Sequence, residues 1–363
     1  MIKVLIFTVG SFVFTFLLAP FIINILYRFQ IREAIRADGP QSHLVKEGTP
    51  TMAGILIIIA VSAVNLLFNL SRAETYLPIF ALIAAGILGI LEDIFKIHRK
   101  SFLINFFRQS LVIKSKEART PLSKIRNFIS FPWRIFKEIF RALGSKDDIG
   151  LKSYQKFLFQ AAIGTFLALW FYFKLDWNTV WLPFLGDINI GFLYPILIVL
   201  IFTFFLNSVG VTDGLDGLAG GLLSLLFASL SAIALIQNQI GLAIFSATIV
   251  GSLLAFLYFN FYPARVFMGN VGSHALGATA AVVAMLLHKE LVLLIMGGVF
   301  VVEMTSVILQ VASVKLYGRR VFRMAPIHHH FELCGWPETK VTMRFWLLGA
   351  FLSLLGVLLS IVK

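Results

Sequence analysis

Long apolar runs separated by short polar stretches dominate this sequence. An apolar run of about 17 to 25 residues can cross a bilayer as an α-helix. Ten runs reach or approach that length, and they lie at about 2–27, 52–70, 76–93, 157–173, 191–207, 218–236, 240–260, 274–288, 291–313 and 342–362. The run at 274–288 is the shortest. The pattern predicts an all-α polytopic membrane protein with about ten transmembrane helices, in a single transmembrane domain over residues 1–363.

The first run is predicted to stay in the protein as helix one. Apolar residues continue from Phe12 to Tyr27, well past the length of a signal-peptide core, and no small-x-small site precedes Arg28. A cleaved signal peptide is therefore not expected.

Composition agrees with a membrane protein and excludes a soluble globular chain. Hydrophobic residues make up 59% and charged residues 13% of the sequence, and the mean hydropathy is +0.89. The single cysteine, Cys334, excludes an internal disulfide and matches no metal-binding spacing. We expect Cys334 to have no chemical role.

Basic residues are concentrated in alternate loops. Of the 31 Lys and Arg residues, 26 lie in the loops 28–51, 94–156, 208–217, 261–273 and 314–344. Cytoplasmic loops carry an excess of Lys and Arg, so these loops are predicted to be cytoplasmic and both termini to lie outside. The net charge of +13 then lies beside membrane spans, which favours membrane lipid and anionic phosphate substrates as partners and no nucleic acid.

One predicted cytoplasmic loop, 94–156, is enlarged and basic. Within it, the segment 131–143 interleaves bulky apolar residues with Arg134, Lys137 and Arg141. This interleaving suits a helix that lies in the interface of an anionic leaflet. The alternative is a solvated basic linker, which fits the 114–126 part better.

Two aspartates, Asp213 and Asp216, follow an apolar run in the motif N-S-V-G-V-T-D-G-L-D-G-L-A-G-G. A charge at the bilayer centre costs roughly 2.5 to 3.5 kcal/mol, so an acidic pair at a membrane border indicates a functional site. Magnesium is usually held by one or two carboxylates together with substrate phosphate oxygens. The pair therefore favours a site for phosphate and a hard cation, and the alternative is an acidic turn exposed to water.

A second acidic pair, Glu92 and Asp93, ends the apolar run at 76–93. Adjacent carboxylates repel each other, so such a pair is a candidate metal neighbour or general base. The alternative is ordinary helix-end charge, with Lys96 as an i,i+3 partner of Asp93.

Polar residues also gather in two loops before predicted spans. The loop 38–54 carries Lys46 between turn-forming glycines and prolines. The segment 259–273 offers Asn260, Phe267, Asn270 and several glycines. Backbone N–H groups at a helix start can bind an anion, and an aromatic ring there can stack on a base. The same glycines also suit simple helix packing.

Three consecutive histidines, His328, His329 and His330, stand in the last polar segment, 318–340. Consecutive side chains point in different directions on a regular backbone, so they do not resemble a three-ligand zinc face. They suit several hydrogen bonds to a polyanion.

These clusters, in this order on predicted cytoplasmic loops, resemble the phospho-N-acetylmuramoyl-pentapeptide transferases of the polyprenyl-phosphate N-acetylhexosamine-1-phosphate transferase superfamily. The motif M-A-P-I-H-H-H-F-E-L-x-G-W-x-E points to the muramoyl-pentapeptide branch. The resemblance covers nearly the whole chain except about 100–150. It implies transfer of phospho-MurNAc-pentapeptide from UDP-MurNAc-pentapeptide to undecaprenyl phosphate with Mg2+, giving lipid I and UMP at the cytoplasmic face of the bacterial inner membrane.

The resemblance also implies roles for individual residues. The catalytic candidates are Asp93, Asp213, Asp216, His328 and His329. Substrate contacts are implied for Lys46, Asn260, Phe267, His330, Lys156, Gln160, Glu303 and Gln310. In this scheme Phe267 stacks on uracil, and Asn270 and Asp213 hold the metal.

The chain departs from the family pattern at four positions. It has Ala53, Glu92, Gly210 and Asn270 where the family usually has Gly, Asp, Asn and Asp. Asn270 keeps an oxygen ligand and loses the negative charge, so metal affinity is expected to fall, and Glu92 reaches one methylene further than Asp.

A second hypothesis follows from these departures, namely a catalytically weakened relative that binds the nucleotide or the polyprenyl lipid without turnover. A transport protein is disfavoured, because its ionisable residues are expected nearer the bilayer midplane. A homodimer is compatible with the sequence.

Overall fold

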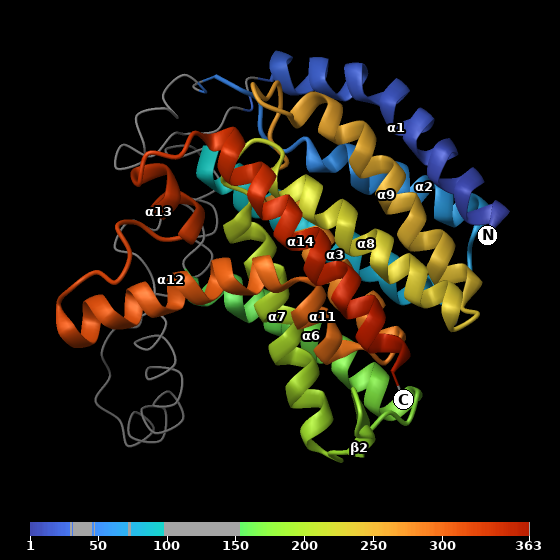
Figure 1. Ribbon diagram of the computed structural model, residues 1–363. Coiled ribbons are helices and arrows are strands. Elements are labelled where there is room, and N and C mark those ends of the chain that lie inside the picture. The colour runs from blue at the N-terminus through green and yellow to red at the C-terminus, as the bar shows by residue number, and fades with distance from the viewer. Residues whose placement is uncertain (30, 32–45, 47, 72–73, 98–152, 363) are drawn as a thin grey trace, which may run out of the picture.

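The computed structural model describes residues 1–29, 31, 46, 48–71, 74–97 and 153–362. The predicted interfacial helix at 131–143 and most of the enlarged loop lie outside the described residues. The helices are α1 (Ile2–Arg28), α2 (Gly54–Phe68), α3 (Tyr76–Ile97), α6 (Ser153–Leu169), α7 (Leu193–Thr212), α8 (Leu218–Ile236), α9 (Ile240–Asn260), α10 (Gly269–Leu286), α11 (Glu290–Met296), α12 (Gly298–Tyr317), α13 (Ile327–Leu333) and α14 (Glu338–Ile361). A π-helical turn, Trp170–Lys174, follows α6. The all-α polytopic prediction is confirmed (Figure 1).

Nine helices in the described part of the chain are long and apolar enough to cross a membrane. The remaining predicted run, 52–70, forms α2, which has 15 residues and is followed by Asn69 as its C-cap. The Asn69 side chain donates hydrogen bonds to Asn65 Oδ1 and to the backbone oxygen of Gly241, both at 2.9 Å, and this fixes the end of α2. The predicted span 274–288 forms α10, which begins earlier, at Gly269, and with 18 residues is the shortest of these nine helices.

Helix α10 lies at the centre of the bundle, packed against α2, α3, α7 and α8. Its sequence is rich in Gly, Ala and Ser, and small residues let membrane helices approach closely. A Cβ on Gly54 of α2 would overlap the backbone of Gly272, and one on Gly89 of α3 would overlap the backbone of Asn270. These two contacts fix α2 and α3 against the first turns of α10.

The predicted span 291–313 is divided at Gly297 into α11 and α12. A Cβ on Gly297 would lie 2.6 Å from the ring of Phe205, so α7 packs directly against the break. From there α12 runs out of the bundle toward α13 (Figure 1), and the exposed residues near its end include Leu316 and Tyr317.

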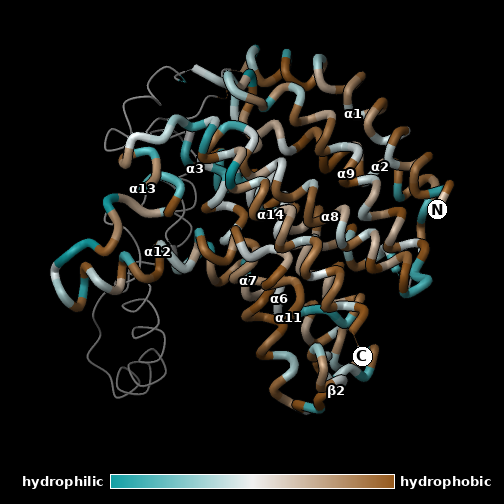
Figure 2. Tube along the Cα trace, viewed as in Figure 1, coloured by the Kyte–Doolittle hydropathy of each residue, from teal (hydrophilic) through white to brown (hydrophobic). Residues whose placement is uncertain are grey.

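The two ends of the bundle differ. At one end lie α13, the start of α14, and the α7–α8 and α9–α10 connections (Figure 1), where hydrophilic residues are frequent (Figure 2). We call this the polar end. Both chain termini lie at the opposite end. That both termini lie outside stays a prediction.

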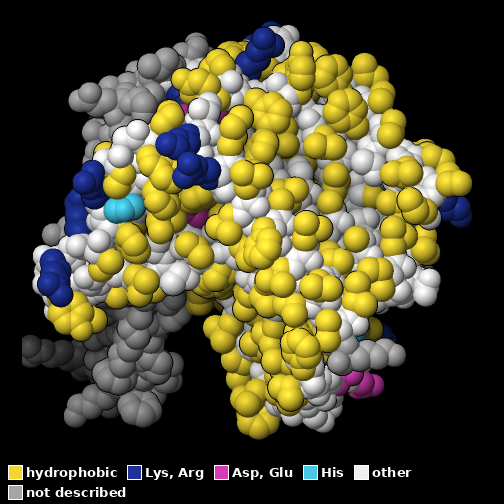
Figure 3. All heavy atoms as spheres, in the orientation of Figure 1, with side chains coloured by type: hydrophobic (Ala, Val, Ile, Leu, Met, Phe, Trp, Pro, Cys, Tyr) yellow, Lys and Arg dark blue, Asp and Glu magenta, His cyan; other side chains and the backbone are white. Residues whose placement is uncertain are grey.

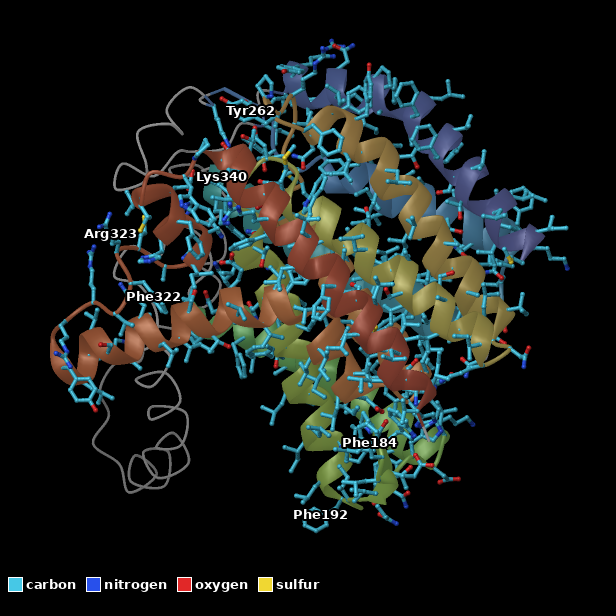
Figure 4. The ribbon with its side chains drawn as sticks, viewed as in Figure 1. Phe184, Phe192, Tyr262, Phe322, Arg323 and Lys340 are labelled. Carbon is cyan, nitrogen blue, oxygen red and sulfur yellow. The ribbon has the colours of Figure 1, made fainter. Side chains whose placement is uncertain are left out.

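The opposite end carries a β-hairpin that the sequence analysis did not predict. Strands β1 (Thr179–Leu182) and β2 (Gly186–Asn189) pair antiparallel between α6 and α7. The Lys289 ammonium lies 2.8 Å from the ring centroid of Trp181 and anchors the hairpin to the α10–α11 turn. Figure 4 shows Phe184 and Phe192 at this end, both largely exposed.

Charge follows the same division on the visible surface. Lys and Arg side chains gather over α13 and the start of α14, while apolar side chains cover most of the remaining helices (Figure 3). Arg323 and Lys340 belong to the basic part (Figure 4). A wide apolar surface with a basic border is what a protein embedded in a bilayer requires.

Candidate functional site

Helices α3, α7 and α10 bring the predicted acidic residues to the polar end. A Cβ on Gly277 would lie 3.0 Å from Leu206 Cα, and a Cβ on Gly210 would lie 3.4 Å from the His274 ring. Because residue numbers rise along α7 as they fall along α10, the two helices are antiparallel. One further turn places Asp213, which follows α7, near the start of α10 at Asn270.

Asp93 caps the start of α10. Its Oδ2 accepts a hydrogen bond from the Val271 N–H at 3.2 Å, and the side chain is buried. A carboxylate is favoured at a helix N-terminus, where N–H groups lack partners. Gly269 has a φ of +70°, and a Cβ there would lie 2.8 Å from Asp93 Oδ2, so the approach requires glycine.

Glu92 is held by two lysines. Its Oε1 accepts a hydrogen bond from Lys156 Nζ of α6 at 2.6 Å and lies 3.5 Å from Lys96 Nζ. Lys96 is thus an i,i+4 partner of Glu92. The i,i+3 pairing of Lys96 with Asp93 stays a prediction.

Gln160 and Gln310 are bound within the chain. Gln160 exchanges hydrogen bonds with Asn207 of α7, at 2.7 and 3.2 Å, and links α6 to α7. Gln310 accepts from the N–H groups of Val321 and Phe322 and donates to the Phe322 carbonyl at 3.0 Å. In this state the Gln310 amide fixes the segment after α12.

Lys46 joins two carboxylates from distant parts of the chain. Its Nζ donates to Asp216 Oδ1 and to Glu338 Oε1, both at 2.6 Å. Burial by itself lowers the pKa of Lys46, but the charges of Glu338 and Asp216 outweigh burial and raise the pKa above its ordinary value. Lys46 is therefore charged throughout the physiological pH range.

Both carboxylate oxygens of Asp216 accept hydrogen bonds. Besides Lys46, its carboxylate accepts from the Ala264 N–H at 2.9 Å, and its own backbone N–H donates to Glu338 Oε1 at 2.6 Å. Only 3% of its surface is exposed. Asp216 thus ties the α7–α8 turn to the α9–α10 segment and to α14.

Asn260 and Phe267 border the same network. Asn260 accepts from the Gly217 N–H at 3.1 Å and donates to the Val266 carbonyl at 2.8 Å, so both functional atoms of its amide are used in the fold. The Phe267 ring is partly exposed, with Lys46 Nζ 5.9 Å from its centroid. The ring offers an aromatic face beside a cation.

The three histidines bond to three different partners. His328 Nδ1 lies 3.0 Å from Glu303 Oε2, and both side chains are almost fully buried. His329 Nδ1 lies 2.7 Å from Glu332 Oε2. His330 Nδ1 accepts from the Arg323 N–H at 3.1 Å.

His328 reaches the aspartate turn. A Cβ placed on Gly214 would lie 2.5 Å from His328 Nε2, so only glycine fits between Asp213 and Leu215. The Nε2 atom has no hydrogen-bond partner among the described residues. The isolated Glu303 in α12 is thereby explained, since it holds the histidine that packs on this turn.

Asp213 and Asn270 are the residues that would hold a magnesium ion in this site. No cluster of three or more His, Cys, Asp or Glu residues with metal-binding geometry occurs among the described residues. Asp213 follows the end of α7 and Asn270 lies at the start of the antiparallel α10. The buried Asn270 Nδ2 has no hydrogen-bond partner among the described residues. One carboxylate and one amide oxygen fit a magnesium ion that takes its other ligands from phosphate and water.

Sequence reasoning missed two residues of the site, Glu338 and His274. Glu338 is the last residue of the quoted M-A-P-I-H-H-H-F-E-L-x-G-W-x-E motif, and its place after Pro337 could have marked it as a helix start. His274 was assigned to the apolar run at 274–288. An ionisable residue in a transmembrane run indicates a functional site, so His274 could have been recognised from the sequence.

Comparison with known proteins shows the class and the family. The family model described as glycosyl transferase family 4 matches residues 131–288, and together with the nine described helices of membrane length this match indicates a polytopic membrane transferase. The phospho-N-acetylmuramoyl-pentapeptide-transferase of Geobacillus sp. (strain WCH70) is 37% identical over 97% of this chain and 96% of its own length. The protein of the same name from Desulforamulus reducens is 38% identical over 96% and 93%, and that of Bacillus pumilus is 36% identical over 99% and 98%. The chain belongs to the phospho-N-acetylmuramoyl-pentapeptide-transferase family.

Proposed function

We propose that this protein transfers phospho-MurNAc-pentapeptide from UDP-MurNAc-pentapeptide to undecaprenyl phosphate in peptidoglycan synthesis. The products are lipid I and UMP. The observation that carries the proposal is identity of 36 to 38% to transferases of this name over nearly the full length of both chains. We place the reaction at the cytoplasmic face of the bacterial inner membrane, because the Lys and Arg side chains of the described residues gather over α13 and the start of α14 at the polar end (Figure 3).

The overall reaction exchanges one phosphoanhydride for another. An oxygen of undecaprenyl phosphate forms a bond to the sugar-bearing phosphorus, the bond from that phosphorus to the UMP oxygen breaks, and UMP leaves with the electron pair. Such transfers depend mainly on positioning and on neutralising charge. A magnesium ion held by Asp213 and Asn270 would supply part of that neutralisation.

The residues of the chain supply the positioning. Phe267 offers a face for the uracil ring, next to Lys46 and Asp216. The pair of His328 and Glu303 stands behind the aspartate turn, where an imidazole N–H can meet a diphosphate oxygen. Lys156 and Lys96 bring positive charge to the end of α3. Asp93 lies beside the first N–H groups of α10 and is the candidate base or lipid-phosphate neighbour.

The test is UMP release from UDP-MurNAc-pentapeptide by the purified protein in detergent with undecaprenyl phosphate, across a magnesium titration. Release that depends on both substrates is the expected result. If the protein released no UMP at any magnesium concentration and Asn270→Asp restored release, the proposal that this chain is an active transferase would be overturned. That result would favour the second hypothesis, a weakened relative that binds without turnover.

A further inference from the structure

Helix α14 presents a stripe of three side chains to the aspartate turn. Glu338 Oε1 accepts from the Asp216 N–H at 2.6 Å, Thr342 Oγ1 donates to the Asp216 carbonyl at 3.4 Å, and Trp346 Nε1 donates to the Leu218 carbonyl at 3.4 Å. The three residues are spaced by four, so they share one face of the helix.

Glu338 is the member of the stripe that also reaches a charged side chain. The same Oε1 that accepts from Asp216 accepts from Lys46 Nζ at 2.6 Å. Lys46 is therefore fixed from two sides, by Asp216 of the turn and by Glu338 of α14. The three side chains come from positions 46, 216 and 338, and they meet only in the folded protein.

The three side chains of this cluster are largely buried. The Asp216 side chain is 1% exposed, that of Glu338 7% and that of Lys46 14%. Two carboxylates with one ammonium carry one net negative charge, so the cluster depends on its hydrogen bonds to hold that charge away from water. The position of Glu338 in the first turn of α14 helps, because the helix N-terminus favours a carboxylate.

We propose that Glu338 is a positioning residue that sets Lys46 and the Asp213–Asp216 turn for nucleotide binding, with Thr342 and Trp346 as supports of the same turn. This inference rests on the proposed function, in which Lys46 and Phe267 contact the nucleotide. Glu338 acts through Lys46 and Asp216 and has no contact of its own with the substrate. Its loss lowers nucleotide affinity by freeing Lys46.

The experiment compares the full-length protein with Glu338→Gln and uses UMP binding by calorimetry in detergent, with KM and kcat measured beside it. Gln keeps the size and one acceptor oxygen and removes the charge. The expected result is a loss of UMP affinity of about tenfold, because a hydrogen bond to a charged group contributes that much or more. KM for UDP-MurNAc-pentapeptide rises by a similar factor, and kcat changes less.

A double-mutant comparison separates positioning from direct contact. In a Lys46→Met background, Glu338→Gln is expected to cost less than twofold further, since Lys46 is gone and the amide oxygen of Gln can still accept from the Asp216 N–H. Thr342→Val is expected to weaken UMP binding by about twofold, in keeping with its longer hydrogen bond. If the losses of UMP affinity from Lys46→Met and Glu338→Gln were additive in the double variant, the inference would be overturned.

Lys340→Met is the matched control on the same helical turn. Lys340 is exposed and its Nζ lies 4.9 Å from the Trp336 ring, on a different face from the stripe. Its variant is expected to bind UMP like the wild type. If the wild type and Glu338→Gln bind UMP equally and have equal thermal stability, the positioning role of Glu338 is overturned and the proposed function is not. Absence of UMP binding and release in the wild type overturns the proposed function.

Discussion

The polar end contains two regions that differ in how completely their polar atoms are partnered. In the first, which we call the nucleotide region, Lys46, Asp216 and Glu338 are hydrogen-bonded to one another, and Asn260 beside them bonds to the backbone of Gly217 and Val266. In the second, which we call the phosphate region, Glu92 Oε2, Asn270 Nδ2 and His274 Nδ1 are buried without any partner among the described residues. Unsatisfied buried groups cost roughly 1 to 3 kcal/mol each, so the second region is the one that a ligand or water would complete.

The departures from the family pattern all belong to the phosphate region or border it, apart from Ala53. Asn270 and His274 are one helical turn apart on α10, and His274 lies within electrostatic range of Glu92. The missing side chain at Gly210 leaves the space beside the His274 ring. Glu92 and Gly210 thus both lie near His274, which is one helical turn from Asn270. This arrangement predicts that the three departures are coupled.

The largest effect is expected in the nucleotide region, from Asp216→Ala. The change leaves the Ala264 N–H without its acceptor and Lys46 with Glu338 alone. Truncating one partner of a buried hydrogen-bonded charge pair costs roughly 2 to 5 kcal/mol. We expect UMP release to fall by about 100-fold or more, measured at saturating magnesium.

Asp216→Asn serves as the control for folding, since it keeps the shape of the side chain. It is expected to unfold at nearly the wild-type temperature and still to lose most activity, because the charge that holds Lys46 is gone. If the activity of Asp216→Ala were within threefold of the wild type, the hydrogen bonds of the nucleotide region would not be required for activity, and this prediction would be wrong.

The next effect concerns the phosphate region and magnesium. Asn270→Asp adds a carboxylate to the proposed pair of Asp213 and Asn270, and metal affinity rises with the charge of the ligands. We expect the half-saturating magnesium concentration to fall by about tenfold, and Mn2+ binding followed by electron paramagnetic resonance to strengthen in parallel. Asn270→Ala is the matched opposite change, and an identical metal requirement in all three proteins would rule out this position as a ligand.

These regions also show how far the sequence could lead. The apolar runs located the helices, because a span must bury its backbone polar groups in its own hydrogen bonds. The runs ended too early at the polar end: α3 continues to Ile97, α7 to Thr212, and α10 begins at Gly269. The polar turns that extend these helices carry site residues. A prediction from hydropathy therefore left the helix ends that carry the candidate chemistry outside the predicted helices.

The pairings within the site could not be predicted from one sequence. The separations between Lys46 and Asp216 and between Lys46 and Glu338 are 170 and 292 residues, and nothing local fixes such contacts. Motif resemblance placed Asn260 and Gln310 toward substrate, whereas the described contacts use both amides within the fold. The hairpin was missed because its strands are only four residues long.

A smaller effect tests whether the departures are coupled. Gly210→Asn adds a side chain whose Cβ would lie 3.4 Å from the His274 ring, and crowding in a packed core costs about 1 to 3 kcal/mol. We expect a lower unfolding temperature in detergent for the single variant. His274→Ala in the same chain makes room and is expected to recover most of the loss. Additive effects of the two changes would mean that the departures are independent.

The smallest effect separates the two lysines that hold Glu92. Lys96 is 43% exposed at its side chain and lies 3.5 Å from Glu92, whereas Lys156 is 25% exposed at 2.6 Å. Exposed ion pairs contribute about 0 to 1 kcal/mol, so Lys96→Met is expected to change UMP release by less than about threefold. Lys156→Met removes the closer partner of a buried carboxylate and is expected to cost more, in both activity and unfolding temperature. If Lys96→Met were the more damaging change, Lys96 would have to contact substrate directly, and the phosphate region would then extend outward along α3.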